Sequence, residues 1–233
     1  MDVEQYRDSN YALSSAFPAL MRKVFVWMTL ALAITGITAF GVATSPALIS
    51  AIFGSKVLFW GLIIAEFALV MGISGAISRM SLSTATLLFV LYSVVNGATL
   101  SVIFLAFSMS VIAKTFFITA GTFGVMALVG YTTKTDLTSM GKLLFMALLG
   151  LIIATVVNLF VQSTGFDLII SYVGVLIFVG LTAYDTQKIK QMCLEAPNGG
   201  DMSQKLALLG ALTLYLDFIN LFLYLLRIFG RKE

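Results

Sequence analysis

The sequence predicts an all-α integral membrane protein with seven membrane-crossing helices. Its 233 residues are 60% hydrophobic and only 11% charged, and the mean hydropathy is +1.02. In an ordinary soluble domain about a quarter of the residues are charged. The apolar residues form long unbroken runs, whereas a membrane β-barrel shows short segments of alternating hydrophobicity. The composition therefore excludes an ordinary soluble domain, and the long runs favour helices over a barrel.

Seven apolar segments are long enough to cross a bilayer, which takes roughly 20 helical residues. They cover residues 24–43, 57–78, 84–107, 111–131, 142–163, 167–187 and 206–229. The connections are short, and the longest is a polar loop at 188–205. We expect a short cytosolic tail at 1–22 and one seven-helix transmembrane domain at 23–233.

Small residues recur at helical spacing within several of these segments. Gly121 precedes Gly124 in the fourth segment, and Gly174 precedes Gly180 in the sixth. Small residues let membrane helices approach one another closely. Both pairs therefore predict helix packing.

The distribution of Lys and Arg predicts a cytosolic N-terminus. Basic residues collect on the cytoplasmic side of membrane proteins, and in this orientation only Lys56 and Lys114 fall in outer loops. The inner tail and loops hold Arg7, Arg22, Lys23, Arg79, Lys134, Lys142, Lys188, Lys190 and Lys205. The basic C-terminus lies outside if the last segment crosses fully, and inside if that segment is re-entrant, so both topologies stay open. We expect a bacterial inner membrane, and an internal eukaryotic membrane stays open.

The composition also limits the cofactors and the partners. The chain has no histidine and one cysteine, so zinc and haem sites lack their usual ligands and we expect no cofactor. A pH sensor would have to use carboxylates, because imidazole is absent. The net charge of +3 comes from residues that flank the membrane segments, so we expect the lipid bilayer as a partner and no nucleic acid.

The last apolar segment carries a line of polar and small residues at alternating steps of three and four. Such spacing places them on one face of an α-helix. The line is Gly210, Thr213, Asp217, Asn220, Tyr224 and Arg227. Asp217 is the unusual member, because a carboxylate at the bilayer centre costs about 2.5–3.5 kcal/mol on insertion scales. It is therefore a candidate functional residue, and the alternative is a structural carboxylate bonded to Thr or Asn.

A second aspartate, Asp185, ends the preceding apolar segment. The two segments are consecutive and can pack as an antiparallel pair. Two acids on neighbouring helices can share one proton, because two like charges are costly in a low dielectric. Asp185 and Asp217 are thus a candidate pH sensor. The alternative for Asp185 is a residue at a helix end that faces water.

Two further charged residues lie in or beside the second segment. Glu66 is at its middle among apolar neighbours, where it is either a protonated structural residue or part of a cation or proton path. Arg79 is at its inner end. Arginine there commonly extends its charge to the interface, and the alternative is a counter-charge for the aspartate pair.

The motif YDTQ at 184–187 and the stretch LYLDFINLFLYLLRIFG at 214–230 resemble the signature of the Bax inhibitor-1 family, the transmembrane Bax-inhibitor-motif proteins. The similarity extends over nearly the whole chain from about Phe17. The resemblance implies a seven-helix fold with the last helix at the centre and a pH-sensitive calcium leak. It also implies that Asp185 and Asp217 form a hydrogen-bonded latch, with Arg79 as its partner and Glu66 along the permeation path.

We therefore expect a calcium-permeable leak that is gated by protonation. A proton shared by Asp185 and Asp217 holds the latch, and its loss leaves two repelling charges. Calcium prefers oxygen ligands, so Asp185, Asp217 and Glu66 are candidate transient ligands, with Asn220 and Thr213 along the path. A proton–calcium exchanger would use the same residues.

Two other classes of function stay open. The first is a regulator of another membrane protein or protease, which would carry no flux of its own. The second is an intramembrane aspartyl protease, because two aspartates lie on consecutive helices. Such proteases resemble Gly-x-Gly-Asp at the second aspartate, whereas this chain has Leu214-Tyr215-Leu216 before Asp217. We therefore expect no enzyme activity.

Overall fold

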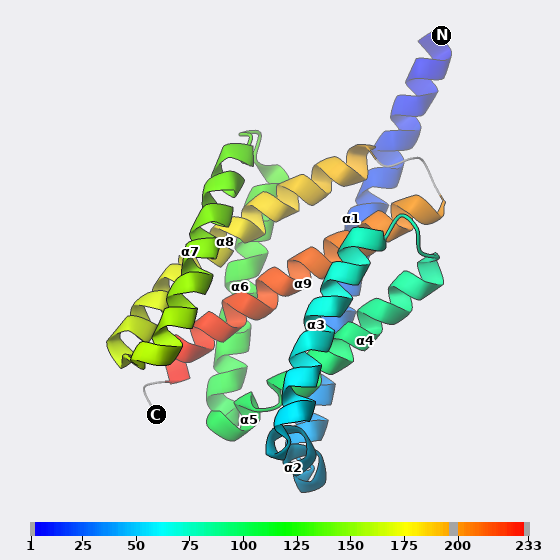
Figure 1. Cartoon of the computed structure of the whole chain (residues 1–233). Helices are drawn as coiled ribbons and strands as arrows, with labels where there is room; N and C mark the ends of the chain where they lie inside the picture. The colour runs from blue at the N-terminus through cyan, green and yellow to red at the C-terminus, as the bar shows by residue number, and fades with distance from the viewer. Residues whose placement is uncertain (1–2, 196–199, 231–233) are drawn as a thin grey trace. The chain divides into compact units, whose positions relative to one another are not determined.

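The computed structural model describes residues 3–195 and 200–230, with side chains from residue 18 onward. These residues form α-helices and no strand (Figure 1). The helices are α1 (Val3–Ala43), α2 (Pro46–Gly54), α3 (Lys56–Ala76), α4 (Leu82–Leu100), α5 (Ile103–Ala106), α6 (Met109–Thr132), α7 (Thr138–Val161), α8 (Thr164–Glu195) and α9 (Asp201–Phe229). The predicted all-α class is confirmed.

Seven stretches of these helices are long and apolar enough to cross a membrane, and each overlaps one predicted segment. They are Pro18–Ala43, Lys56–Ala76, Leu82–Ala106, Met109–Thr132, Thr138–Val161, Thr164–Glu195 and Asp201–Phe229. The chain is therefore an integral multi-pass membrane protein. The first stretch begins inside the predicted tail at 1–22, and α1 already starts at Val3.

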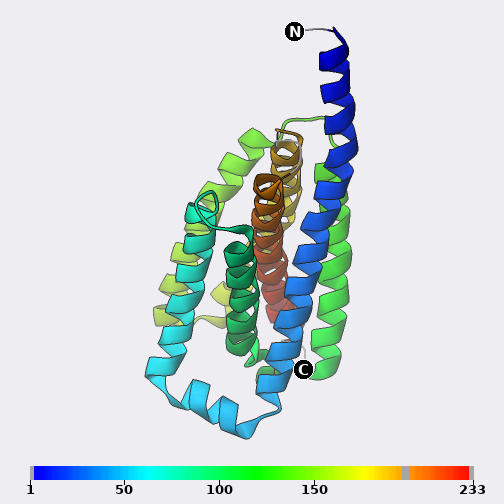
Figure 2. The same cartoon turned by 90° about the vertical axis from the view of Figure 1, so that its right-hand side faces the viewer.

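Two short helices were not predicted as separate elements: α2 lies between two predicted segments, and α5 lies at the end of the predicted segment 84–107. Figure 2 shows α2 as a short segment that joins the ends of α1 and α3. Ser45 caps α2 by accepting a hydrogen bond from the Leu48 N–H at 3.5 Å. Pro46 occupies the first helical position, where its missing N–H costs no hydrogen bond. α5 follows a break after α4, where the Ser101 hydroxyl donates to the Ala98 carbonyl at 2.7 Å.

The predicted loop at 188–205 is wrong, because helix occupies most of it. α8 continues to Glu195 and α9 begins at Asp201. Ile189 and Cys193 lie one turn apart on α8 and are 3% and 4% exposed. This stretch is amphipathic, so its low mean hydropathy hides a buried helical face. Residues 196–199 lie outside the described residues.

The last helix is one unbroken element that is long enough to cross the membrane. α9 is a continuous helix of 29 residues, whereas a re-entrant segment needs a turn within the membrane. The structure thus favours a full crossing over the re-entrant alternative. α9 is also the most buried of the seven spans: 67% of the residues in its most apolar stretch are buried, compared with 44% in that of α8. Its position at the centre of the fold stays a prediction.

The chain divides into two compact units. Unit 1 contains residues 1–106 and 189–215, and unit 2 contains residues 107–188 and 216–233. In unit 1, α1 and α3 both pack on α4. In unit 2, the rings of Phe116 and Phe123 on α6 each lie 5.5 Å from the ring of Phe218 on α9.

The glycine prediction is right for one pair and wrong for the other. A Cβ on Gly174 would lie 2.7 Å from the Tyr224 ring, and one on Gly180 would lie 2.7 Å from Leu144. Among the described residues, nothing lies within 4 Å of a Cβ on Gly121 or Gly124. Spacing places small residues on one face of a helix but does not say whether another helix covers that face.

The close contact of α6 is made by Gly130 instead. A Cβ there would overlap the backbone carbonyl of Ala183 on α8. Backbone cannot move aside as a flexible side chain can, so α6 and α8 pack this closely only with glycine at 130.

We expect Gly130→Ala to destabilise the protein by about 1–3 kcal/mol, because overpacking forces the backbones of α6 and α8 apart. Thermal unfolding in detergent measures the change. Gly121→Ala and Gly124→Ala are matched controls on the same helix with open space around the new methyl group. They should be neutral or slightly stabilising, because alanine favours helix over glycine. Equal loss of stability in all three variants would contradict the contact.

Candidate functional site

Asp185 and Asp217 form a pair inside unit 2. Asp185 lies on α8 and Asp217 on α9, and a side-chain hydrogen bond joins their carboxyl groups. A carboxylate has no hydrogen to donate, so this bond requires a proton on one of the two groups. The pair therefore carries at most one negative charge as long as the bond exists.

Asp217 is the more buried of the two acids. Its side chain is 5% exposed, whereas Asp185 is only partly buried. Its Oδ2 atom is also buried without a hydrogen-bond partner among the described residues. An ionised oxygen in that position would be costly, whereas the carbonyl oxygen of a neutral acid is much less so. The neutral form of Asp217 thus fits both observations.

The hydroxyl groups beside Asp185 on α8 do not support the pair. Thr182 donates to the Phe178 carbonyl and Thr186 donates to the Thr182 carbonyl, both at 2.7 Å. These bonds stay within the helix. The charge that acts on Asp185 from its own helix is Lys188.

The two predicted pathway residues on α9 bond within their own helix. The Thr213 hydroxyl donates to the Leu209 carbonyl at 3.1 Å, and the Asn220 side chain donates to the Leu216 carbonyl at 2.8 Å. Such bonds satisfy a polar side chain inside a membrane helix without a partner helix. Asn220 still presents its side-chain oxygen, and the pathway role of both residues stays a prediction.

Glu66 lies in unit 1, on α3. A side-chain hydrogen bond joins it to Thr99 of α4. Its Oε1 atom is buried without a partner among the residues that the structure describes. On the same helix as Thr99, the Asn96 amide donates to the Tyr92 hydroxyl at 3.0 Å. Glu66 therefore belongs to a polar region of α3 and α4, and its place on an ion path stays a prediction.

Arg79 is in the turn that follows α3. Its backbone N–H donates to the Ala76 carbonyl at 2.9 Å, and its side chain is exposed. Within residues 18–195 and 200–230 it makes no salt bridge. Arg79 belongs to unit 1 and the aspartate pair to unit 2, so its role as counter-charge stays a prediction.

A closed metal site is absent from the described residues. They contain no group of three or more Asp, Glu or Cys side chains that could hold a metal ion. The aspartates thus form a pair and not part of a three-carboxylate site. Transient contact between calcium and Asp185, Asp217 or Glu66 needs no such site and stays a prediction.

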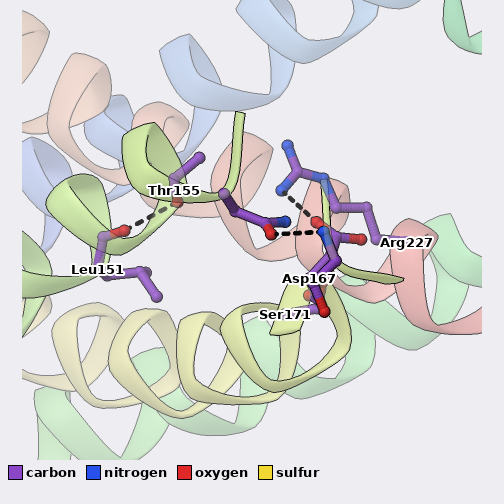
Figure 3. Close-up of polar contacts among 7 residues, drawn as sticks. Leu151, Thr155, Asp167, Ser171 and Arg227 are labelled. Atoms are coloured by element: carbon purple, nitrogen blue, oxygen red, sulfur yellow. Dashed lines mark hydrogen bonds and ion pairs between the residues drawn. The ribbon is translucent and has the colours of Figure 1, made fainter. Parts of the chain in front are cut away.

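A second charged pair in unit 2 was not predicted. The Asp167 carboxylate at the start of α8 lies 3.9 Å from the Arg227 guanidinium at the end of α9 (Figure 3). Arg227 also lies over the Tyr224 ring, 5.4 Å from its centroid, and Tyr224 is hydrogen-bonded to Thr155 of α7. The sequence did contain a signal for this pair. Asp167 is at the start of the sixth apolar segment and Arg227 is near the end of the seventh, and these two ends lie together when the segments are antiparallel.

Comparison with known proteins places the chain among membrane proteins of one family. The family model described as "Inhibitor of apoptosis-promoting Bax1" matches residues 18–233. The chain is similar to the Escherichia coli (strain K12) "Inner membrane protein YbhL", with 47% identity over 235 residues that cover 100% of each chain. The match includes the segments that carry Asp185 and Asp217.

Relatives in other bacteria are similar over most of their length. A protein of Borreliella burgdorferi is 46% identical over 213 residues, which cover 91% of this chain and 92% of the relative. A protein of Rickettsia prowazekii is 44% identical over 217 residues, which cover 91% of this chain and 89% of the relative. The relatives are therefore similar to most of the chain and not to one motif.

A proton shared by Asp185 and Asp217 predicts that stability depends on pH. Between about pH 6 and pH 9 we expect the unfolding temperature of the wild-type protein in detergent to fall until the folded pair loses its proton and to stay level above that pH, because the unfolded acids are already ionised in this range. Asp217→Asn keeps a hydrogen-bond donor but has no proton to lose, so its profile should be flat in this range.

Asp167→Asn is the control for this measurement. It removes a carboxylate of the same unit that is 30% exposed and paired with Arg227. Exposed ion pairs contribute about 0–1 kcal/mol, so this variant should keep the wild-type profile. A wild-type profile without any transition would contradict a shared proton.

Proposed function

Since the chain belongs to the Bax inhibitor-1 family of multi-pass membrane proteins, we propose that it is a pH-sensitive calcium leak. The supporting observation is the hydrogen bond between Asp185 and Asp217 within membrane-spanning helices. Two hydrogen-bonded acids form a two-state element that one proton controls. In this proposal transport is the activity and the aspartates catalyse no reaction.

The proposed gate opens when the proton leaves. With the proton in place the two carboxyl groups attract each other and hold α8 against α9. Without it two negative charges face each other in a low dielectric, which favours separation of the helices. The separated carboxylates then offer oxygen ligands to a passing calcium ion, and Arg79 is the proposed partner that compensates the released charge.

The proposed location is a bacterial inner membrane with the N-terminus in the cytoplasm. The E. coli relative is named as an inner membrane protein. The orientation rests on the excess of Lys and Arg in the tail and in alternate loops. With seven crossings it leaves the C-terminus outside.

The test is calcium flux into liposomes that contain the purified protein, from about pH 6 to about pH 8, the range in which a coupled carboxyl pair can titrate. We expect flux that rises with pH, because deprotonation breaks the hydrogen bond. Asp217→Asn should remove the pH dependence, since its amide does not titrate.

A matched control is Asp136→Asn, which removes an exposed carboxylate outside the spans. Hydrogen bonds from the side chain and the backbone N–H of Thr138 hold the pKa of Asp136 below its usual value. Asp136 is therefore ionised throughout this pH range, and its loss should leave the shape of the flux profile unchanged. If Asp217→Asn also leaves it unchanged, the gate is not the aspartate pair.

Flux driven by an opposing proton gradient would identify a proton–calcium exchanger instead of a leak. The absence of flux at every pH would favour the regulatory alternative, in which the protein acts on another membrane protein and Asp217 is structural.

A further inference from the structure

The residues around Asp185 on α8 are tied to the hairpin that α6 and α7 form. Ala183 lies against Gly130 of α6 so closely that a Cβ on the glycine would overlap its carbonyl. The ring of Tyr184 lies so close to Gly141 of α7 that a Cβ on this glycine would overlap the ring. Asp185 directly follows both contacts in the chain.

Gln187 makes the third tie, to the loop between α6 and α7. Its Nε2 donates to the Thr135 carbonyl, and its Oε1 accepts from the Leu137 N–H, both at 2.8 Å. The side chain is 8% exposed. A buried amide is stable only with its hydrogen bonds formed, so Gln187 and the loop hold each other in one arrangement.

The loop is itself fixed to both helices of the hairpin. The Thr133 N–H donates to the Val129 carbonyl of α6 at 2.8 Å. The Thr138 N–H at the start of α7 donates to the Asp136 carboxylate at 2.9 Å. Gln187 is therefore hydrogen-bonded to a loop that is itself held in place by both helices of the hairpin.

We propose that Gln187 is a positioning residue, which ties α8 to the α6–α7 loop and thereby fixes Asp185 for its hydrogen bond with Asp217. The contact of Tyr184 with Gly141 also holds α8 against this hairpin and so contributes to the position of Asp185. Neither residue touches the shared proton, and both act through the position of Asp185. The inference deepens the proposed function and rests on it only for the step from proton to flux.

The charges around Asp185 do not replace this role. Lys188 on its own helix and Asp217 on α9 are the ionisable groups that act on it. The α6–α7 side contributes Lys134, Asp136 and Lys142, and all three side chains are exposed. None of these groups donates a hydrogen bond to Gln187, so its amide can be removed without changing a charge.

The test is the pH profile of the unfolding temperature in detergent, which reports the shared proton without any transport assay. Gln187→Met keeps the length of the side chain and loses both hydrogen bonds. We expect its transition to move to lower pH by about half a unit or more, because Asp217 holds its proton less well when Asp185 is displaced and one unit corresponds to only about 1.4 kcal/mol. Gln191→Met, at an exposed position one turn further on α8, should keep the wild-type transition.

A purely structural role gives a different result. The unfolding temperature of Gln187→Met would then fall equally at every pH, with the transition unmoved, and this result would overturn the proposal. If Gln187→Met does not fold, Gly141→Ala replaces it, because the new methyl group displaces Tyr184 and should move the transition in the same direction. An unmoved transition in Gly141→Ala would overturn the proposal as well.

Calcium flux into liposomes separates this proposal from the proposed function. Shifted unfolding transitions together with absent flux in the wild-type protein would support the positioning role and reject the leak. Flux with an unmoved transition in Gln187→Met would support the leak and reject the positioning role.

Discussion

A hydrogen bond between two carboxyl groups forms only when one of them holds a proton, and this constraint applies to Asp185 and Asp217 in unit 2. Asp185 and Asp217 lie within membrane-spanning helices, where water cannot screen a second charge. The pair joins two consecutive antiparallel helices, so its protonation state and the packing of α8 on α9 are linked. In the proposed function this pair senses pH in a chain that has no histidine.

The two partners of this bond have different surroundings. Asp217 is almost fully buried on α9, the most buried span, and its neighbour Phe218 packs on aromatic rings of α6. Asp185 lies among residues that are held by backbone contacts and by the amide of Gln187. Ring packing depends on area and tolerates small shifts, whereas paired hydrogen bonds depend on direction. Directional hydrogen bonds and backbone contacts thus fix the position of Asp185, whereas apolar burial fixes the position of Asp217.

The remaining polar groups of the spans show why few of them are candidates for function. Hydroxyl groups within the spans donate hydrogen bonds to carbonyl groups of their own helix, as at Thr182, Thr186 and Thr213. The pair of Asp167 and Arg227 is partly exposed, so water is an alternative partner for both side chains. Oxygen atoms that are buried without partners occur at Asp217 and Glu66 among the described acids. Buried acids of this kind are costly to retain in a membrane protein unless they bind a proton or an ion.

The sequence by itself determined the class, the seven spans and the candidate aspartates, because bilayer thickness and the cost of a buried charge act on composition and spacing alone. It did not determine the continuation of α8 through Cys193, since an amphipathic helix lacks the hydropathy of a span. Nor did it show that Gly130, and not Gly121, contacts α8, or that Gln187 is hydrogen-bonded to the α6–α7 loop. Those contacts join residues about 50 positions apart, at sequence separations of 50 and 52 for the two Gln187 bonds. Only the tertiary structure decides them, because helical spacing specifies a face while the packing of the helices specifies what that face meets.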